Sequence, residues 1–363
     1  MTKVAILGDV HIGARNDSDV ISSFQEKFFS EVFFPTLKER GITNIIQVGD
    51  LFDRRKYIEF NSLHKAKKYL FDQISINNMH MHVIVGNHDT RYKNSNHVNS
   101  PDLLLEGYSE EIFVYADPTH IYYGAFGAEP SDKKIAMLPW ICPENEQKSM
   151  EMIQESDADI LFGHLELDGF EMYRGAPHAG GLSASLFSKF QLVCSGHFHH
   201  RSKVGNINYV GTPYETTWSD YGDPKGFHIL DLETLDMEFI ENPNRLFHKI
   251  KYDDSKWSNA SWIDGFDFTD LKDSYVKVIV INKSNPYWFD LYMDKLEKMN
   301  PAQVQVVEDN LNLDLVDDDD ILENIDDTLT ILHKSIETMA TDVDKNLLDN
   351  LFKSLYTEAL DMD

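Results

Sequence analysis

Side chains that can bind a metal follow five apolar runs within the first 200 residues of the chain. The stretches are KVAILGDVH, NIIQVGDLFD, MHVIVGNHD, DADILFGH and FQLVCSGHFHH, and each apolar run ends in or beside a glycine. The candidate ligands are Asp9, His11, Asp50, Asn87, His164, His197 and His199. Carboxylate, amide and imidazole groups together suit Mn, Fe or Zn, and they fit neither a thiolate site nor an all-oxygen calcium site.

Seven ligands are too many for one tetrahedral ion, but they fit two ions that share a bridging group. Asp50 is the natural bridge, because a carboxylate can bind two cations about 3.5–4 Å apart. Two divalent cations against two carboxylates leave the site positive, so that it can bind a phosphate and generate hydroxide from water. A single Gly-Asp or Gly-His pair is common in turns and does not by itself indicate a metal site. Five such strand ends in succession predict a two-metal site for in-line attack on phosphorus.

Three further polar residues lie one to three positions beyond these ligands. His88 is the best candidate for a general acid that protonates the oxygen leaving phosphorus. We expect Asp53 to orient that imidazole and raise its basicity, as carboxylates near metal sites do. Asp89 fits a role in supporting its own loop by hydrogen bonds. The alternative for His88 and Asp53 is that both are ordinary polar loop residues.

The five apolar runs predict buried strands, because they are short, rich in Val and Ile and bounded by glycine. Helical periodicity over residues 19–40, ended by Gly41, and over residues 61–76 places helices between the early strands. This alternation predicts a layered α/β domain, in which ligands bind beyond the carboxyl ends of the strands. After residue 90, shorter runs suggest a second half with more antiparallel pairing.

Composition limits the class of protein. The chain has 363 residues, 42% of them apolar, which is enough for more than one domain. No stretch approaches the roughly 18 apolar residues of a membrane helix, and the first residues lack the features of a signal peptide. With only two distant cysteines, Cys142 and Cys194, we expect buried thiols in a reducing compartment. We therefore expect a cytoplasmic protein without membrane association.

The formal net charge of −28 is unfavourable for binding nucleic acid, but it is unevenly distributed. Half of it comes from residues 301–363, which hold 17 acidic and 3 basic residues. Basic residues lie close to the polar motifs instead. The candidates for contacts with phosphate are Arg15, Arg54, Arg55, Arg91, Lys93 and Arg201. Each of them alone is equally consistent with an ordinary surface residue.

The motifs GDVH, GDLFDRR, GNHD, GH and GHFH resemble those of the calcineurin-like metallophosphoesterase superfamily. Three longer stretches resemble SbcD-type DNA repair nucleases, and among these the nuclease subunits of T-even phage recombination complexes. They are LPWICPEN (138–145), GHLELDGFEMYRG (163–175) and YVGTPYETTWSDYGDPKGFHILDLET (209–234). The resemblance implies a two-sheet α/β sandwich. It also shows one departure, because archaeal and eukaryotic members have a second histidine where this chain has Asp53.

Carried over by motif, the resemblance implies two ligand sets that share Asp50. One is Asp9, His11, Asp50 and His199, and the other is Asp50, Asn87, His164 and His197, with His88 as the catalytic acid. It further implies a Mn²⁺-dependent nuclease, with Mg²⁺ as the alternative metal. The implied activities are exonuclease action on double-stranded DNA ends and endonuclease action on single strands or hairpins. The implied partner is a coiled-coil ATPase of the SbcC type, bound by a nuclease homodimer within a heterotetramer.

The last third divides into three further segments. A strand–helix–strand pattern predicts a small α/β capping domain over residues 246–310, after a nuclease domain over 1–245. An acidic linker (311–320) precedes residues 321–363, where apolar residues recur at intervals of 3 and 4. We expect a C-terminal helical hairpin that docks the ATPase coiled coil. The alternative is that these helices pack on the core of the chain itself.

Two other functions remain open at this point. The same metal site fits a phosphomonoesterase or a cyclic-nucleotide phosphodiesterase. A non-catalytic tether of DNA ends, with metals that only stabilise the fold, is the second alternative, and the full ligand set argues against it.

Overall fold

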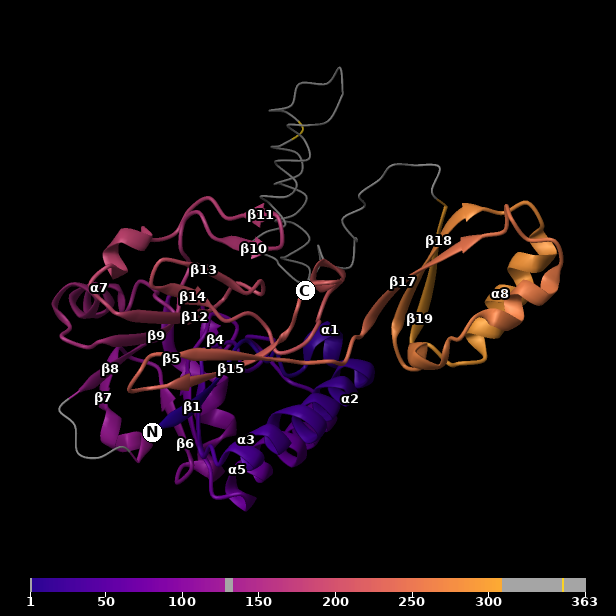
Figure 1. Cartoon of the computed structure of the whole chain (residues 1–363). Coiled ribbons are helices and arrows are strands. Elements are labelled where there is room, and N and C mark those ends of the chain that lie inside the picture. The colour runs from indigo at the N-terminus through magenta and orange to yellow at the C-terminus, as the bar shows by residue number, and fades with distance from the viewer. Residues whose placement is uncertain (1, 128–132, 309–347, 349–363) are drawn as a thin grey trace. The chain divides into compact units, whose positions relative to one another are not determined.

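The structure is a computed structural model, and it describes residues 2–127, 133–308 and 348. The chain separates into two units, Met1–Asp309 and Asn310–Asp363. Apart from Leu348, the predicted acidic linker and helical hairpin lie outside the described residues. Both therefore stay predictions, and the following paragraphs concern the first unit (Figure 1).

The first sheet has six strands in the order β16-β15-β1-β2-β3-β6. The four strands β1, β2, β3 and β6 are parallel, and β15 pairs antiparallel with both β1 and β16. Their bounds are β1 Lys3–Leu7, β2 Asn44–Gln47, β3 His80–Ile84, β6 Ile112–Tyr115, β15 Gly226–Asp231 and β16 Met237–Glu241. The first strand of the chain thus lies at the centre of this sheet.

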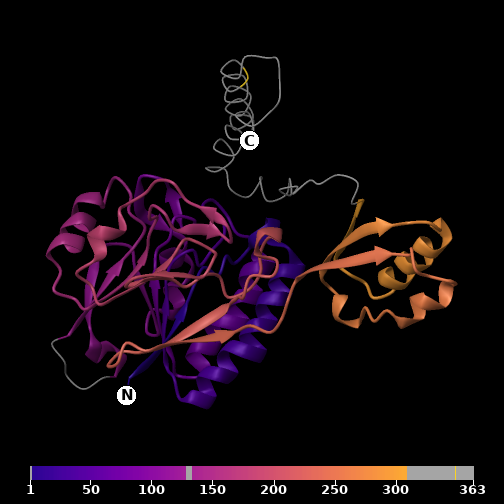
Figure 2. The ribbon, with the colours of Figure 1, turned by 45° about the horizontal axis from the view of Figure 1, so that its top comes forward.

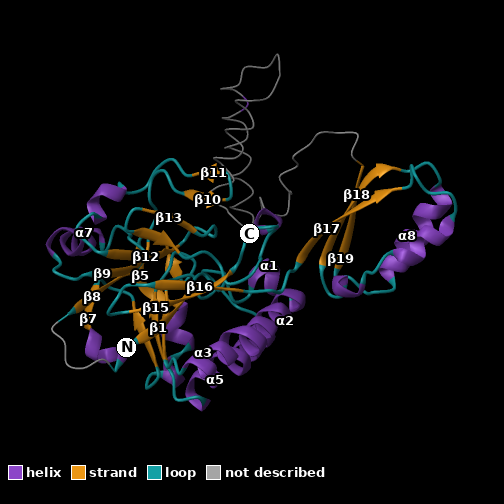
Figure 3. Ribbon diagram, viewed as in Figure 1, coloured by secondary structure: helices purple, strands orange, loops and turns teal. Residues whose placement is uncertain are grey.

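The second sheet also has six strands, in the order β13-β14-β12-β9-β8-β7. The inner strands β14, β12, β9 and β8 are parallel, and the edge strands β13 and β7 are antiparallel to their neighbours. Their bounds are β7 Thr119–Tyr122, β8 Lys134–Leu138, β9 Ile160–His164, β12 Leu192–Gly196, β13 Ser202–Val204 and β14 Ile207–Tyr209. Both sheets appear as orange strands in Figure 3.

The two predicted helices are present, and each contains a π-helical turn. The first runs through α2 (Asp19–Phe28), a π turn at Phe29–Phe33 and α3 (Phe34–Arg40), and it ends at Gly41 with φ 64°. The second runs through α4 (Phe60–Ala66), a π turn at Lys67–Phe71 and α5 (Asp72–Ile76). Their apolar residues pack with those of β1, β2 and β3 in one core cluster, so these helices cover one face of the first sheet.

A second core cluster lies between the two sheets, where Ile6, Ile46 and Val48 pack with Phe162 and Cys194. A third cluster covers the other face of the second sheet and includes Met152 and Ile153 of α7 (Glu146–Glu155). The layers are therefore helices, sheet, sheet and helix, which confirms the predicted two-sheet α/β sandwich.

The prediction of more antiparallel pairing after residue 90 is confirmed. Before that point the pairs β1–β2 and β2–β3 are parallel, whereas the later pairs β7–β8, β13–β14 and β15–β16 are antiparallel. Parallel pairing also continues in the later part, because β6 is parallel to β3, and β8 and β14 are each parallel to one neighbour.

A third sheet follows the sandwich in sequence, with three parallel strands in the order β17-β18-β19 (Figures 1 and 2). The helix α8 (Pro286–Glu297) connects β18 (Tyr275–Asn282) to β19 (Gln303–Glu308), as the sequence pattern predicted. The strand β17 (Phe247–Asp253) was not singled out from the sequence. Tyr252 and Tyr292 lie at the centre of a separate core between this sheet and α8.

The remaining elements are short. They are α1 Ala14–Asp17, which has left-handed backbone at Arg15 and Asn16, β4 Thr90–Tyr92, β5 Ser95–Asn99, α6 Ser100–Leu104, β10 Glu171–Tyr173 and β11 Ala176–Pro177. Single 3₁₀ turns occur at Glu106–Tyr108, Tyr123–Phe126, Ala184–Phe187, Trp218–Asp220, Ala260–Gly265 and Thr269–Leu271. Within the described ranges, no helix has the length and apolar character that crossing a membrane requires.

The core between the two sheets can be tested with matched substitutions. Phe162 is fully buried and Phe60 is 87% exposed, so Phe162→Ala should leave a cavity and Phe60→Ala should not. We expect Phe162→Ala to lower the free energy of unfolding by about 3–5 kcal/mol. Phe60→Ala should change it by no more than about 0.5 kcal/mol. Denaturant unfolding followed by fluorescence would measure both, and equal effects would contradict this core assignment.

Candidate metal centre

The predicted ligands lie just beyond the carboxyl ends of five strands. Asp9 and His11 follow β1, Asp50 follows β2, and Asn87 follows β3, so these four come from the first sheet. From the second sheet, His164 is the last residue of β9, and His197 and His199 follow β12. The structure brings all seven into two neighbouring groups linked by direct contacts.

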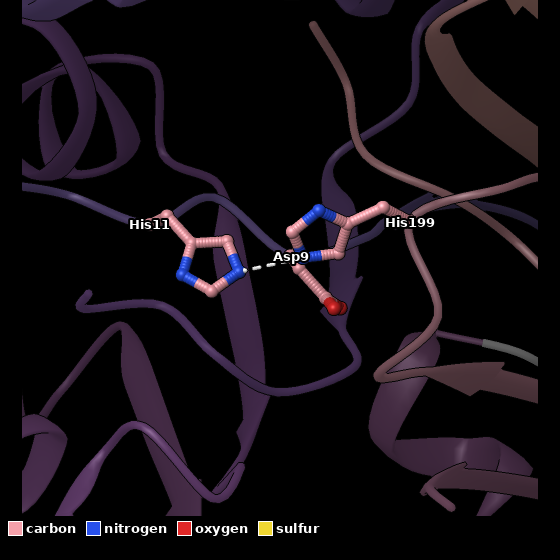
Figure 4. A group of neighbouring side chains, drawn as sticks. All are labelled: Asp9, His11 and His199. Carbon is pink, nitrogen blue, oxygen red and sulfur yellow. Dashed lines mark hydrogen bonds between the residues drawn. The ribbon is translucent and has the colours of Figure 1, made fainter. Parts of the chain in front are cut away.

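Asp9, His11 and His199 form the first group, in which one ligand atom from each lies within 4.8 Å of the others. Figure 4 shows the imidazoles of His11 and His199 facing each other, with their Nε2 atoms 3.1 Å apart. One carboxylate oxygen of Asp9 accepts a hydrogen bond from the backbone N–H of His197, at 2.9 Å. The other, Oδ1, is buried without a hydrogen-bond partner in the described structure.

Asp50, His164 and His197 form the second group, again with ligand atoms within 4.8 Å. Asn87 completes it, because its Oδ1 lies 2.9 Å from His164 Nε2 and 3.1 Å from His197 Nδ1. The backbone N–H of His88 donates to Asp50 Oδ1 at 2.8 Å. This group contains the four residues that the resemblance assigned to the second ion.

The contacts within the second group fit a bound cation. His164 Nδ1 lies 2.9 Å from the carbonyl of Val48, a contact in which the ring must be the donor. The opposite atom, Nε2, faces two oxygens, Asn87 Oδ1 at 2.9 Å and Asp50 Oδ2 at 3.3 Å. This convergence of a ring nitrogen and two oxygens fits a positive charge between them, either a proton on Nε2 or a metal ion.

The first group repeats this arrangement. His11 Nδ1 pairs with Asp53 Oδ1 at 3.2 Å, which leaves its Nε2 directed at the Nε2 of His199. A carboxylate that holds one ring nitrogen of a histidine fixes the ring so that the other nitrogen can bind a metal. Together with the unpartnered Asp9 Oδ1, these atoms form a buried site that suits a second cation.

The electrostatics of the two groups also favours cations. Burial would raise the pKa of Asp50, but the nearby His164 and His88 hold that pKa well below its usual value, so Asp50 stays ionised. Burial disfavours protonation of His11 and His164, but the neighbouring carboxylates outweigh it and raise their pKa values to about 10 and about 9. The same negative potential attracts a divalent ion.

His197 and His199 show the opposite shift. Burial lowers the pKa of His199 to about 3 and holds that of His197 well below its usual value, with a further contribution from neighbouring histidines. Both imidazoles are therefore neutral near pH 7. Neutral imidazole is the form that coordinates a metal.

Three of the ligands have left-handed backbone conformations, with φ 49° at His11, 52° at Asp50 and 85° at His197. Residues other than glycine rarely adopt this conformation, and it persists where surrounding contacts stabilise it. The backbone of Asp50 is stabilised by two hydrogen bonds. Its carbonyl group accepts from the backbone N–H groups of Val10 and His11, at 3.0 Å each. The turns that aim the ligands are therefore held by bonds between strand ends.

Two glycines of the motifs lie so close to other side chains that a Cβ atom would not fit. A Cβ atom on Gly49 would lie 2.1 Å from His164 Nδ1, and one on Gly86 would lie 2.2 Å from Asp50 Oδ1. Gly49 also has φ 102°, which other residues rarely adopt. Both positions lie so close to ligand side chains that they exclude any larger residue.

Asp89 supports its loop, which confirms the prediction. Its carboxylate accepts hydrogen bonds from the backbone N–H groups of Leu51, Phe52 and Gly86, at 3.3, 2.9 and 2.9 Å. It thereby joins the segment after β2 to the segment after β3.

Asp53 differs in part from its predicted role. His88 Nδ1 lies 2.6 Å from the backbone carbonyl of Asp53, so the main chain of Asp53 orients that imidazole. The carboxylate pairs with His11 instead. The rings of His11 and His88 stand edge to face, with centroids 5.0 Å apart, and one ligand atom from each of His11, Asp53 and His88 lies within 4.8 Å of the others. The spacing of residues in the sequence could not show that His88 contacts the backbone carbonyl of Asp53 and His11 contacts its carboxylate.

Two of the predicted DNA contacts lie beside these loops. Arg54 Nε lies 3.8 Å from Asp53 Oδ2, and the guanidinium of Arg54 also covers the ring of Tyr57. Arg55 donates to Thr90 Oγ1 at 3.2 Å. Both guanidinium groups therefore stand next to the segments that carry Asp53 and His88.

The other predicted contacts lie against aromatic rings or at exposed positions. The guanidinium of Arg15 lies 4.9 Å from the ring centre of Tyr275, in the third sheet, and that of Arg201 lies 4.2 Å from the ring centre of Phe239. Arg91 covers the ring of its neighbour Tyr92, and Lys93 is exposed. The six basic candidates thus have different local partners, and Arg54 also donates to Asn16, the neighbour of Arg15.

Two aromatic residues next to the metal ligands were not predicted as site residues. The ring of Trp140 has its centre 5.2 Å from that of His197 and 6.1 Å from that of His164. Tyr173 lies edge-on to His199 at 5.9 Å. Both belong to stretches quoted above for their resemblance, LPWICPEN and GHLELDGFEMYRG, and that resemblance was the only available signal.

The geometry agrees with a comparison against protein families, in which residues 2–201 match the calcineurin-like phosphoesterases. The match covers more than half of the chain and all seven ligands. The chain belongs to the calcineurin-like phosphoesterase family. This confirms the resemblance seen in the motifs.

Two individual relatives match over nearly the whole chain, and a third matches over part of it. Exonuclease subunit 1 of Enterobacteria phage T4 is 33% identical over 361 residues, which is 98% of this chain and 99% of that protein. An SbcCD nuclease subunit of Staphylococcus epidermidis is 24% identical over 374 residues, 92% of this chain and 95% of that protein. The corresponding protein of Staphylococcus saprophyticus is 23% identical over 218 residues, 58% of this chain and 52% of that protein. The similarity to SbcD-type nucleases is therefore confirmed.

The close approach at Gly49 provides a test of the phosphoesterase centre. In Gly49→Ala the new methyl group should displace His164 and weaken Mn²⁺ binding by about 10-fold or more. Gly107→Ala is the matched control, because nothing lies within 4 Å of the position of its Cβ. Calorimetric titration with Mn²⁺ would compare the two variants. Unchanged affinity in Gly49→Ala would contradict the assignment of His164 as a ligand.

Proposed function

We propose that this chain is the nuclease subunit of a DNA end-processing complex and hydrolyses phosphodiesters with two divalent ions. The observation that carries the proposal is the pair of neighbouring ligand groups, one with Asp9, His11 and His199 and the other with Asp50, His164 and His197, in a phosphoesterase fold. The names of the relatives, an exonuclease subunit and two SbcCD nuclease subunits, indicate the substrate class. A role in recombination and repair follows from that substrate.

The seven ligands would hold the ions in the two sets named above, with Asp50 as the bridge. Ions bound there would polarise a phosphate group and lower the pKa of a water molecule that attacks phosphorus. Mn²⁺ suits the mixture of carboxylate, amide and imidazole ligands, and Mg²⁺ is the alternative. Both cysteines are buried, and neither belongs to the ligand groups, which agrees with a site of oxygen and nitrogen ligands.

The side chains around the ions have separate tasks. The carbonyl of Asp53 holds His88 Nδ1, so Nε2 of that ring is left to deliver a proton to the departing oxygen. The carboxylate of Asp53 holds His11 in position as a ligand. Trp140 and Tyr173, next to His197 and His199, offer ring faces on which a nucleotide base can stack.

The proposed substrates are DNA ends, digested as double strands, and single strands or hairpins, cut internally. Arg54 and Arg55 are the best placed of the six basic candidates to contact phosphate, because they adjoin Asp53 and Thr90. The third sheet and α8 would form the capping domain, which limits the DNA structures that reach the metals. With Arg54 and Arg55 beside the site, a strongly acidic chain could bind DNA through this small region alone.

The partner we propose is a coiled-coil ATPase of the SbcC type, because two relatives are named as subunits of SbcCD nucleases. The apolar 3,4 pattern of residues 321–363 suits docking to a coiled coil. The nuclease subunit would form a homodimer within a heterotetramer. It would act where DNA is present, in the cytoplasm of the cell that contains it, which is the host cell if a phage encodes it.

The rival activities share the metal centre, so substrates must separate them. We expect the protein with Mn²⁺ to degrade end-labelled duplex DNA and to release little phosphate from a small monoester. His88→Ser should retain Mn²⁺ and DNA binding but lose cleavage by about 100-fold or more, because the general acid is removed. His97→Ser, at an exposed position, is the matched control.

Two outcomes would overturn the proposal. Turnover of the monoester or of a cyclic nucleotide alone would favour the rival phosphoesterase activities. DNA binding without any cleavage in Mn²⁺ or Mg²⁺ would favour the DNA-end tether. Unchanged cleavage by His88→Ser would remove only the assignment of the acid.

Docking of the ATPase can be tested by ending the chain at Asp320. We expect a folded protein that still binds Mn²⁺ but no longer binds the ATPase, because the predicted hairpin is removed. In the full chain, Leu332→Glu on the apolar repeat should weaken ATPase binding, and Lys334→Glu off the repeat should not. Co-purification of the two proteins would measure this, and full binding by the truncated chain would refute the docking role.

A further inference from the structure

The imidazole of His199 lacks the support that two other ligands have. Nδ1 of His164 donates to the carbonyl of Val48. Nδ1 of His11 lies 3.2 Å from Asp53 Oδ1 as an ion pair, although this contact lacks hydrogen-bond geometry. In His199, Nδ1 is buried and has no hydrogen-bond partner among the described residues. Histidines that bind metals are usually oriented by a hydrogen bond to the other ring nitrogen. Contacts to the main chain of His199 therefore matter more for holding this ligand in place.

A buried lysine supplies that contact. Lys225 is 2% exposed, and its Nζ donates to the backbone carbonyl of His199 at 2.8 Å. The same ammonium group lies 2.7 Å from Asp220 Oδ1 and 3.0 Å from Asp223 Oδ2. Its three N–H donors thus match three acceptors, one of which belongs to a predicted metal ligand.

The carboxylates around Lys225 are themselves fixed. Burial would raise the pKa of Asp220, but the charge of Lys225 lowers it to about 2, so Asp220 is ionised. Asp220 Oδ2 also accepts from the backbone N–H groups of Thr216 and Thr217 at 2.9 and 3.1 Å. Asp223 Oδ1 lies 3.0 Å from Nδ1 of His200, the residue after the ligand. The network therefore contacts two successive residues of the loop after β12.

This network is costly if it serves packing alone. Burial of one ammonium and two carboxylates requires desolvation, and well-packed apolar residues of similar size are often as stable or more stable. A buried network of charged groups is easier to explain if it holds a neighbouring residue in one particular position. Among the seven candidate ligands in the described part of the chain, the network contacts His199, whose Nδ1 has no hydrogen-bond partner there.

We propose that Lys225, held by Asp220 and Asp223, is a positioning residue that sets the place of His199 in the first ion site. This rests on the two-ion centre of the proposed function. Loss of the Lys225 ammonium should leave the carbonyl of His199 with only the longer hydrogen bond from the backbone N–H of Thr212, at 3.3 Å. It should therefore weaken the ion bound by Asp9, His11 and His199. The ion held by Asn87, His164 and His197 should remain, because Lys225 contacts none of them in the described structure.

The test is Lys225→Met in the full-length chain, with Lys277→Met as the matched control. Lys277 is a second buried lysine, 8% exposed, whose ammonium lies 4.1 Å from the ring centre of Trp218. Titration of metal-free protein with Mn²⁺, followed by calorimetry and by the electron paramagnetic resonance of free Mn²⁺, gives the number and affinity of bound ions. We expect two ions in the wild type and in Lys277→Met. In Lys225→Met the first ion should bind about 10- to 100-fold more weakly.

Loss of folding would not explain the result, because a second variant separates the two effects. Lys225→Met leaves Asp220 buried without its counter-charge, so its stability should fall. The double variant Lys225→Met with Asp220→Asn removes both charges of the pair and should recover most of the thermal stability. If Lys225 positions His199, the double variant should still bind the first ion weakly. A structural role alone would restore both ions.

The outcomes are distinguishable. Two ions bound with wild-type affinity in Lys225→Met, or restored in the double variant, would overturn the role of Lys225 and leave the proposed function intact. If the wild type and Lys277→Met bind no Mn²⁺ and no Mg²⁺, the two-ion centre itself fails, and the role of Lys225 fails with it. Equal weakening of both ions in Lys225→Met would show a general loss of structure and would also overturn it.

Discussion

Asp50 joins the two ligand groups through both its main chain and its side chain. Its left-handed backbone directs the carbonyl group to Val10 and His11, which fixes the turn after β1. Its carboxylate accepts from the N–H of His88 and faces His164. One residue thus ties the ends of three strands, from both sheets, to a single charged group. Substitution of Asp50 would therefore remove the side-chain contacts with His88 and His164, whereas the main-chain bonds to Val10 and His11 do not depend on its side chain.

The two sheets deliver different parts of the site. The first supplies Asp9, His11, Asp50 and Asn87, and the second supplies His164, His197 and His199. The two candidate ligand groups therefore form only when the sheets pack in register, and the apolar core between the sheets sets the distances between these residues. This explains why an extended hydrophobic interface lies directly behind a small polar centre. The candidate ligands carry charges and lone pairs that repel one another, and the packing of the apolar core offsets this repulsion.

The sequence predicted that the seven candidate ligands follow five strand ends and lie together, because glycine after a short apolar run marks a strand end and parallel strands present such ends at one edge. It also predicted the support role of Asp89. It did not predict that Asp53 uses its carbonyl for His88 and its carboxylate for His11, since both atoms belong to the same residue. Nor did it identify Lys225, which lies 26 positions beyond His199 in the chain. These contacts form only in the folded chain, so the spacing of residues in the sequence cannot predict them.

The position of β1 has a consequence for the order of events during synthesis. This strand leaves the ribosome first, but it lies between β2 and β15, and β15 begins only at Gly226. Until then one edge of β1 has no partner, and the carbonyl of His199 has yet to be bound by Lys225. Contacts between such distant segments form slowly. The first sheet can therefore complete its pairing at β1 only late in synthesis, after all seven candidate ligands have been added to the chain.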